Sequence, residues 1–77
     1  MKKFTRIAKN DIIDNVMLYN IFKNSDEDFA HELQRKINQI CADYDFNAEK
    51  ILRTAAVEGT KVLSKMTLSH FSAYFYN

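Results

Sequence analysis

Residues 26–44, DEDFAHELQRKINQICADY, carry the pattern that decides the fold. Apolar side chains recur there at steps of three and four residues, the spacing that aligns side chains along one side of an α-helix. They are Phe29, Leu33, Ile37, Ile40, Cys41 and Tyr44. The positions between them are mostly charged or polar, so the segment predicts an amphipathic helix that buries one stripe against a core.

The start of this helix is marked by Ser25 and the three acidic residues that follow it. Ser25 with Asp28 resembles a capping box, in which the serine hydroxyl accepts a hydrogen bond from a backbone N–H of the first turn. Asp26, Glu27 and Asp28 would lie at the positive end of the helix dipole, which favours negative charge. These signals predict a helix that begins directly after Ser25.

A second helix is predicted over residues 48–66, with Asn47 as its N-cap. Its apolar stripe consists of Ile51, Leu52, Ala55, Ala56, Gly59, Val62, Leu63 and Met66. A glycine inside a helix costs about 1 kcal/mol relative to alanine. We therefore expect compensation from another helix that packs closely on the small residues Ala55, Ala56 and Gly59. The alternative is that Gly59 is a local break or the C-cap of a shorter helix.

The segment 11–23 is apolar nearly all round, which is typical of a helix buried on several sides. Asn10 is its predicted N-cap. A short buried strand over residues 16–22 is the alternative, because periodicity alone does not separate the two.

The C-terminal tail is rich in aromatic residues and begins at Thr67, a predicted N-cap. Leu68, Phe71 and Phe75 fall at helical spacing, although a short strand is again the alternative. The aromatic residues are Phe71, Tyr74, Phe75 and Tyr76. They either complete the core or form a patch that contacts a partner.

Composition supports an all-α fold in a single domain spanning residues 1–77. The chain has no proline and one glycine, where average usage would give roughly 4 and 5. Both residues are common in turns, so their scarcity favours a few long helices over a many-turned β fold. We expect three to four helices, built on an antiparallel hairpin of 26–44 and 48–66.

Charge is segregated along the chain although the net charge is only +1. Residues 1–9 form a basic N-terminal arm with Lys2, Lys3, Arg6 and Lys9, which could lie on nucleic-acid phosphates or be an ordinary basic terminus. Acidic residues dominate the next stretch, and Asp26, Glu27, Asp28 and Glu32 are candidates for a partner contact.

No set of residues in the sequence predicts catalysis or metal binding. Cys41 is the only cysteine, and neither His31 nor His70 has a second ligand at zinc-site spacing. Residues 43–47 match the first positions of an EF-hand loop, but Ala48 occupies the position that requires glycine. One glycine also excludes a glycine-rich phosphate loop. We therefore expect no enzyme activity, no cofactor and no small-molecule substrate.

Residues 29–58 resemble the two helices of the ribbon-helix-helix DNA-binding family. The likeness lies in residues 42–55, ADYDFNAEKILRTA, where a short loop is followed by a small polar cap, an acidic residue, two aliphatic residues, an arginine and an alanine. The resemblance implies an intertwined dimer whose two-stranded ribbon reads the major groove. The ribbon would have to come from residues 16–22, where Asn20 is the only polar side chain that could read a base.

The leading functional hypothesis is a non-catalytic regulator that binds a protein partner, such as an inhibitor, an antitoxin-like factor or a phage protein that acts on host machinery. A DNA-binding repressor is the alternative. The small core and the apolar residues at both ends favour a homodimer. No run of about 18 apolar residues occurs and no export signal is recognisable, so we expect a cytoplasmic protein without membrane contact.

Overall fold

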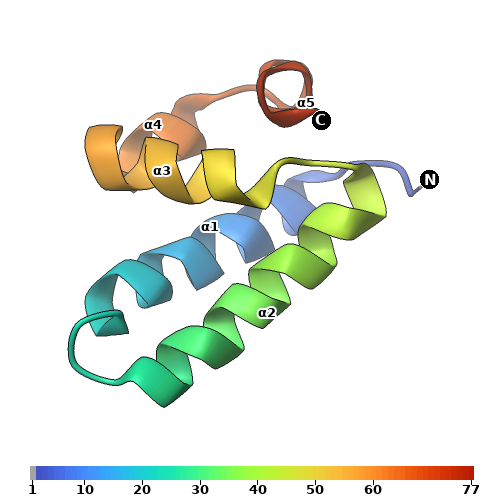
Figure 1. The fold of residues 1–77 in the computed structure, drawn as a ribbon. Helices are drawn as coiled ribbons and strands as arrows, with labels where there is room; N and C mark the ends of the chain where they lie inside the picture. The colour runs from blue at the N-terminus through green and yellow to red at the C-terminus, as the bar shows by residue number, and fades with distance from the viewer. Residues whose placement is uncertain (1) are drawn as a thin grey trace.

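The computed structural model describes residues 2–77, and the elements of this part of the chain are α-helices (Figure 1). They are α1 (Arg6–Phe22), α2 (Glu27–Tyr44), α3 (Ala48–Glu58), α4 (Thr60–Lys65) and α5 (Leu68–Phe75). Within residues 2–77 the β pairing is limited to one isolated antiparallel bridge between Phe46 and Tyr76. The all-α prediction is confirmed, and both segments for which a strand was the alternative are helical.

Helix α2 buries Leu33, Ile37, Cys41 and Tyr44 of its predicted stripe. The other two members differ from the prediction, since Phe29 is exposed and Ile40 is half-buried. Its N-cap is Asp26 rather than Ser25, since the Asp26 carboxylate accepts a hydrogen bond of 3.1 Å from the Phe29 backbone N–H. The capping-box prediction was therefore one residue out of register. Asp45 ends the helix in the left-handed conformation, at a φ of 58°, which asparagine and aspartate tolerate better than most residues.

Helix α1 begins five residues earlier than the sequence pattern predicts. Thr5 is the N-cap, and its hydroxyl accepts a hydrogen bond of 3.2 Å from the Ala8 backbone N–H. Asn10, the predicted cap, lies inside the helix. The basic arm is consequently short, because Arg6 and Lys9 belong to α1.

Helices α1 and α2 form the long antiparallel pair of the fold (Figure 1). The prediction paired residues 26–44 with residues 48–66, but α3 turns across the pair and α4 returns to contact α1. Helix α5 lies at the end of the bundle where α2 passes into α3. The turn of residues 23–26 joins α1 to α2 closely enough to keep the two helices side by side.

Gly59 divides the predicted 48–66 helix into α3 and α4. Its φ of 89° and ψ of 158° lie outside helical space, in a region that residues with a side chain rarely adopt. A Cβ atom built on Gly59 would meet nothing within 4 Å, and Ala56 is exposed while only Ala55 is buried. Close helix packing on these three small residues is therefore wrong, and the alternative of a local break is confirmed.

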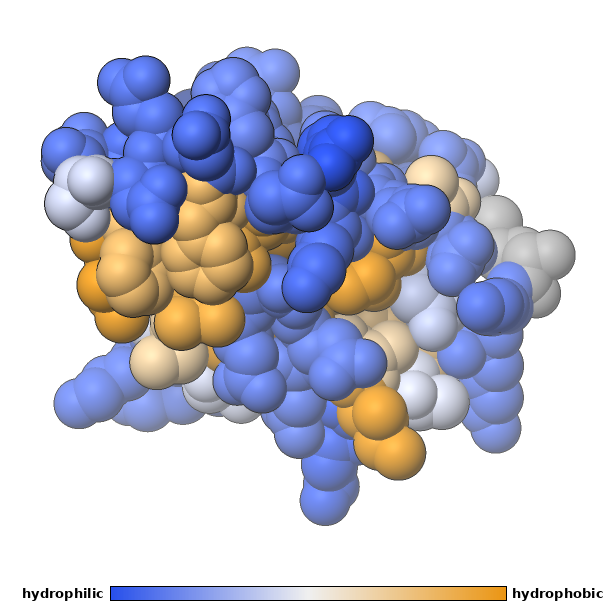
Figure 2. Space-filling model, turned by 90° about the horizontal axis from the view of Figure 1, so that it is seen from below, coloured by the Kyte–Doolittle hydropathy of each residue, from blue (hydrophilic) through white to orange (hydrophobic). Residues whose placement is uncertain are grey.

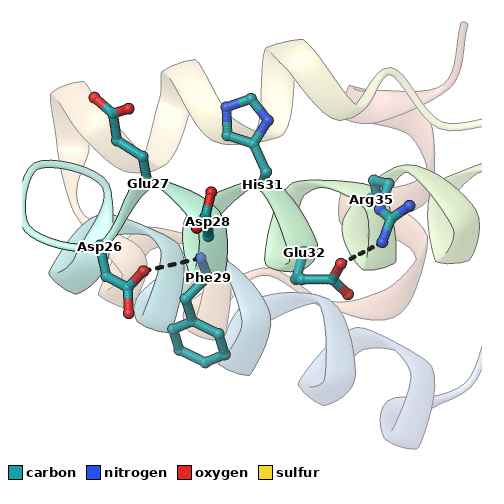
Figure 3. A pocket seen from close by; sticks show the side chains of 7 residues that line it. All are labelled: Asp26, Glu27, Asp28, Phe29, His31, Glu32 and Arg35. Atoms are coloured by element: carbon teal, nitrogen blue, oxygen red, sulfur yellow. Dashed lines mark hydrogen bonds and ion pairs between the residues drawn. The ribbon is translucent and has the colours of Figure 1, made fainter.

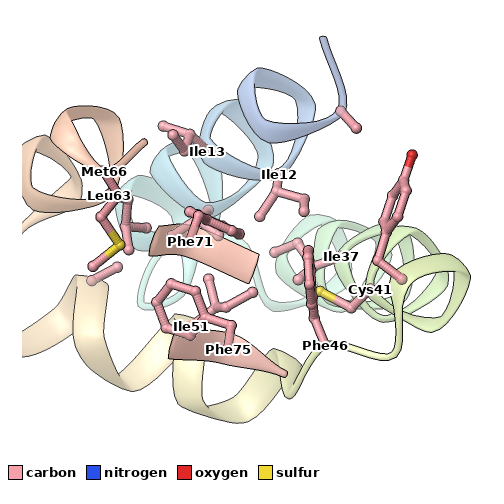
Figure 4. Close-up of a cluster of buried hydrophobic side chains, with 14 residues drawn as sticks. Ile12, Ile13, Ile37, Cys41, Phe46, Ile51, Leu63, Met66, Phe71 and Phe75 are labelled. Carbon is pink, nitrogen blue, oxygen red and sulfur yellow. The ribbon is translucent and has the colours of Figure 1, made fainter. Parts of the chain in front are cut away.

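The core lies where all five helices converge, with Leu63 contributed by α4 (Figure 4). Its fully buried side chains are Ile12, Val16, Leu33, Ile37, Cys41, Ile51, Leu63, Phe71 and Phe75. The radius of gyration, 11.6 Å, is close to the value of about 11.5 Å expected for one compact domain of this length. One copy of the chain thus encloses its own core.

Candidate functional site

The acidic residues proposed as a partner contact all lie in the first turns of α2. Asp26 caps the helix, while Glu27 and Asp28 occupy the first turn, where the helix dipole favours them. Glu32 forms an exposed ion pair with Arg35, one turn further along. The structure therefore brings the four candidates together on one exposed end of a helix.

A shallow hollow surrounds these residues, and Figure 3 shows how its side chains are arranged. The lining residues are Asp26, Glu27, Asp28, Phe29, His31, Glu32 and Arg35. All of them come from α2 or its cap. Glu32 and Arg35 point toward each other, but Glu27, His31 and Phe29 point in different directions, so the side chains do not converge on a common point. This geometry suits a contact with a broad surface, since a small ligand is normally held in a concave site.

An exposed apolar cluster adjoins the acidic end of α2, and it was not among the predicted site residues. We call it the turn patch and define it as Met17, Leu18, Ile21, Phe22 and Phe29. Four of its members are among the exposed large hydrophobic residues, with Ile21 64% accessible, and Phe22 is partly buried. Figure 2 shows apolar side chains gathered at the left of this face, the end where α1 turns into α2 in Figure 1.

The turn patch is held in shape by contacts across the α1–α2 turn. The rings of Phe22 and Phe29 meet edge to face, with centroids 5.1 Å apart and planes at 74°. This geometry is favourable for aromatic pairs. The backbone of Asp26 also donates a hydrogen bond of 2.8 Å to the carbonyl oxygen of Phe22. The apolar patch and the acidic cap are thus parts of one small structural unit.

The aromatic tail divides between the core and the surface. Phe71 and Phe75 are fully buried, so these two candidates complete the core. Tyr74 and Tyr76 remain exposed. The Lys50 ammonium lies 4.1 Å from the centre of the Tyr74 ring and donates a hydrogen bond of 2.7 Å to the Tyr74 carbonyl oxygen. These contacts fix α5 onto α3, and the predicted aromatic patch is reduced to two tyrosines.

The four basic candidates do not form one cationic surface. Lys2 pairs with Asp43 at 3.2 Å, and Lys3 and Arg6 are exposed. Lys9 is 8% accessible and its Nζ donates hydrogen bonds to the backbone carbonyl oxygens of Ser64 and Met66. The Lys9 ammonium therefore acts inside the fold and is not presented to a phosphate.

Cys41, His31 and His70 are not part of any group of potential metal ligands in the described part of the chain. Within residues 2–77 there is no group of three or more His, Cys, Asp and Glu side chains that could hold a metal ion. Cys41 is a free, buried thiol, and burial raises its pKa to about 12. It packs as a small apolar side chain.

Sequence reasoning missed the turn patch because segment 11–23 was read as buried on several sides. Only Ile12, Ile13 and Val16 of its apolar residues are buried. The sequence did contain a signal, because segment 11–23 has more apolar residues than one core-facing side of a helix needs. Apolar residues beyond that face in a surface helix indicate a second contact.

Comparison with known proteins finds no matching family model, no similar curated protein and no similar solved structure. Among the helices of residues 2–77, none has the length and apolar character needed to cross a membrane.

Proposed function

We propose that this protein is a small non-catalytic regulator that acts by binding a protein partner through the turn patch and the adjoining acidic end of α2. The observation that carries the proposal is that Leu18 and Ile21 are exposed near the end of α1, and that Phe29 is exposed next to Asp26 and Asp28 at the start of α2. Inhibitors, antitoxin-like factors and phage proteins that act on host machinery belong to this class.

Exposed apolar area supports this function because it is unfavourable in water unless it is covered. Each Å² of apolar surface removed from water contributes about 25 cal/mol. Leu18, Ile21 and Phe29 do not belong to the buried core cluster. A contiguous apolar patch rimmed by polar residues is typical of a protein interface.

The acidic end of α2, formed by Asp26, Glu27 and Asp28, supports selective binding of one partner over others. Charged groups at the edge of an interface raise the rate of encounter with a partner of opposite charge and disfavour partners of like charge. Asp26 caps α2, and Glu27 and Asp28 follow it in the first turn, so the three negative charges lie next to Phe29 of the patch. We also propose that the protein works in a reducing cytoplasm, where a free thiol such as Cys41 persists.

The test compares two glutamine variants in the turn patch with one control glutamine variant outside it. Leu18→Gln and Ile21→Gln remove apolar side chains from the turn patch, while Val57→Gln changes an equally apolar residue, 79% accessible, on α3. Each tagged protein is used to capture partners from the cells that produce it, and the captured protein is quantified by mass spectrometry. We expect Val57→Gln to retain what the unchanged protein retains and the patch variants to lose it. Equal retention by all three variants would contradict the proposal.

DNA binding in the manner of the ribbon-helix-helix family stays a prediction. Residues 16–22, which would have to supply its ribbon, lie within α1. The discriminating measurement is chromatography on heparin, since phosphate binding predicts retention that falls steeply with salt. Binding through the turn patch instead predicts elution near or below physiological ionic strength, about 0.15 M.

In the homodimer expected from the sequence, a second copy of the chain would cover the turn patch. Sedimentation of the unchanged protein and of Ile21→Gln, which reports the oligomeric state, distinguishes a second copy from a different protein as the partner. A dimer that Ile21→Gln dissociates would identify a second copy as the partner.

A further inference from the structure

The side of α1 that faces away from the core carries five residues in regular order. They are Ile7, Asp11, Asp14, Leu18 and Ile21, and all five are exposed. Their steps of four, three, four and three residues place them in one line along the helix. Ile12 and Val16, on the other side, are completely buried. We call this line the outer stripe of α1; it shares Leu18 and Ile21 with the turn patch.

The spacing of the outer stripe is that of the contact positions in a coiled coil. Alternating steps of three and four residues keep a stripe facing a second helix that crosses at a shallow angle. Helix α1 has 17 residues, and at 1.5 Å per residue it is about 26 Å long. This length offers a second helix more than two heptads of continuous contact.

The charge of the outer stripe restricts what could lie on it. The two ends are apolar and the middle carries two carboxylates. Among residues 2–77, the described ion pairs involve neither Asp11 nor Asp14. A partner that covers Ile7, Leu18 and Ile21 must also come close to this negative charge, and it gains binding energy only if it brings positive charge there.

We propose that the outer stripe of α1 binds an amphipathic helix of another protein, with lysine or arginine residues opposite Asp11 and Asp14 and apolar residues opposite Ile7, Leu18 and Ile21. This inference rests on the proposed function and gives the chemistry of its partner.

A second copy of the chain fits the stripe poorly. In an antiparallel pair, Ile7 faces Ile21 of the other copy, and Asp14 then meets the other Asp14 at the two-fold axis. In a parallel pair in register, each aspartate faces its own equivalent. Like charges at facing positions are destabilising. The same carboxylates repel anionic lipids and nucleic-acid phosphates.

A pair of synthetic helical peptides tests the inference directly. Each has about 21 residues, or three heptads, with leucines at the contact positions. One carries lysines opposite Asp11 and Asp14 and the other carries glutamates there. Binding is followed by the fluorescence anisotropy of the labelled peptide. We expect the lysine peptide to bind at least roughly tenfold more tightly than the glutamate peptide.

Charge-swapped protein supplies the matched control. The double variant Asp11→Lys/Asp14→Lys should prefer the glutamate peptide, reversing the order seen with the unchanged protein. Because two lysines could disturb the fold, Asp11→Asn/Asp14→Asn is a milder second variant, expected to bind both peptides with similar affinity. Val57→Gln should behave as the unchanged protein does.

Two results would overturn the inference. One is equal binding of the lysine and glutamate peptides, or no binding of either, by the unchanged protein. The other is a dimer of the unchanged protein that Ile21→Gln dissociates, which would assign the stripe to a second copy. If the peptides fail while cellular capture still depends on Leu18 and Ile21, the proposed function stands and only the chemistry of the partner is wrong.

Discussion

The Nζ atom of Lys9 lies 2.6 Å from the backbone carbonyl oxygen of Met66, and it also lies 3.0 Å from that of Ser64. These carbonyl groups belong to the C-terminal end of α4, where the helix leaves carbonyl oxygens without partners and its dipole favours positive charge. A lysine from the first turn of α1 therefore links this helix to the end of α4. Every buried polar side-chain atom in residues 2–77 has a hydrogen-bond partner, and Lys9 is the one buried charge.

Replacing Lys9 with methionine should destabilise the protein by about 1–3 kcal/mol, because hydrogen bonds from a charged donor are lost and two partly buried carbonyl oxygens are left unpaired. The free energy of unfolding is measured by denaturation in urea. Lys3→Met, at an exposed position of the same basic segment, is the control and should change stability by less than about 0.5 kcal/mol. If Lys9→Met is as stable as Lys3→Met, the link between α1 and α4 does not contribute as described.

Gly59 should tolerate D-alanine but not L-alanine. Its φ of 89° is unfavourable for L residues and accessible to D residues, and a Cβ atom there has open space around it. L-alanine is expected to cost about 1–3 kcal/mol, while D-alanine should be neutral or stabilising because it restricts the unfolded chain. Both proteins can be prepared by chemical synthesis and compared by thermal unfolding. A stabilising L-alanine would instead indicate a helix that continues through position 59.

The elements that the sequence predicts well are those whose signals are local. The stripe from Leu33 to Tyr44 and the caps at Asn47 and Thr67 depend on residues a few positions apart, and the structure contains them. Gly59 shows the limit of prediction from local patterns. The apolar residues keep helical spacing on both sides of this glycine, so their periodicity does not reveal the break in the helix. The rhythm before and after the break belongs to two separate helices that face the same core.

Contacts between residues far apart in the chain could not be predicted from the sequence for a different reason. Lys9 looks like any basic residue near a terminus until α4 is seen to end beside it. Phe71 and Phe75 are as apolar as the turn patch, yet both are buried. The ring of Phe71 packs against Phe4 and Phe46, and the ring of Phe75 packs against Phe71. Which aromatic residues become core and which stay exposed is decided by the crossing of helices, which no local pattern encodes.

The stability of the protein should fall above about pH 9 through Cys41. Burial raises the pKa of its thiol from an ordinary value of 9.0 to about 12. Below pH 9 the thiol keeps its proton in both the folded and the unfolded chain, so it has no effect there. Between these two values only the unfolded chain loses the proton, which lowers the free energy of unfolding by up to about 1.4 kcal/mol per pH unit.

The contribution of Cys41 is isolated by comparison with Cys41→Ala, because lysine and tyrosine side chains titrate in both proteins over the same range. Urea denaturation between pH 8 and pH 10.5, about 2.5 units across the ordinary thiol pKa, should give a steeper loss of stability for the unchanged protein. Parallel pH profiles for the two proteins would show that the thiol is not as deeply desolvated as its position implies.

The central claim, that a protein partner binds through the turn patch, is tested most directly by site-specific photo-crosslinking in the cells that produce the protein. A photoreactive amino acid replaces Ile21 in one variant and Val57 in the other, two exposed apolar positions on different helices. We predict a crosslinked adduct of one defined mass from position 21 and none from position 57. No adduct from position 21, or the same adducts from both positions, would contradict the claim.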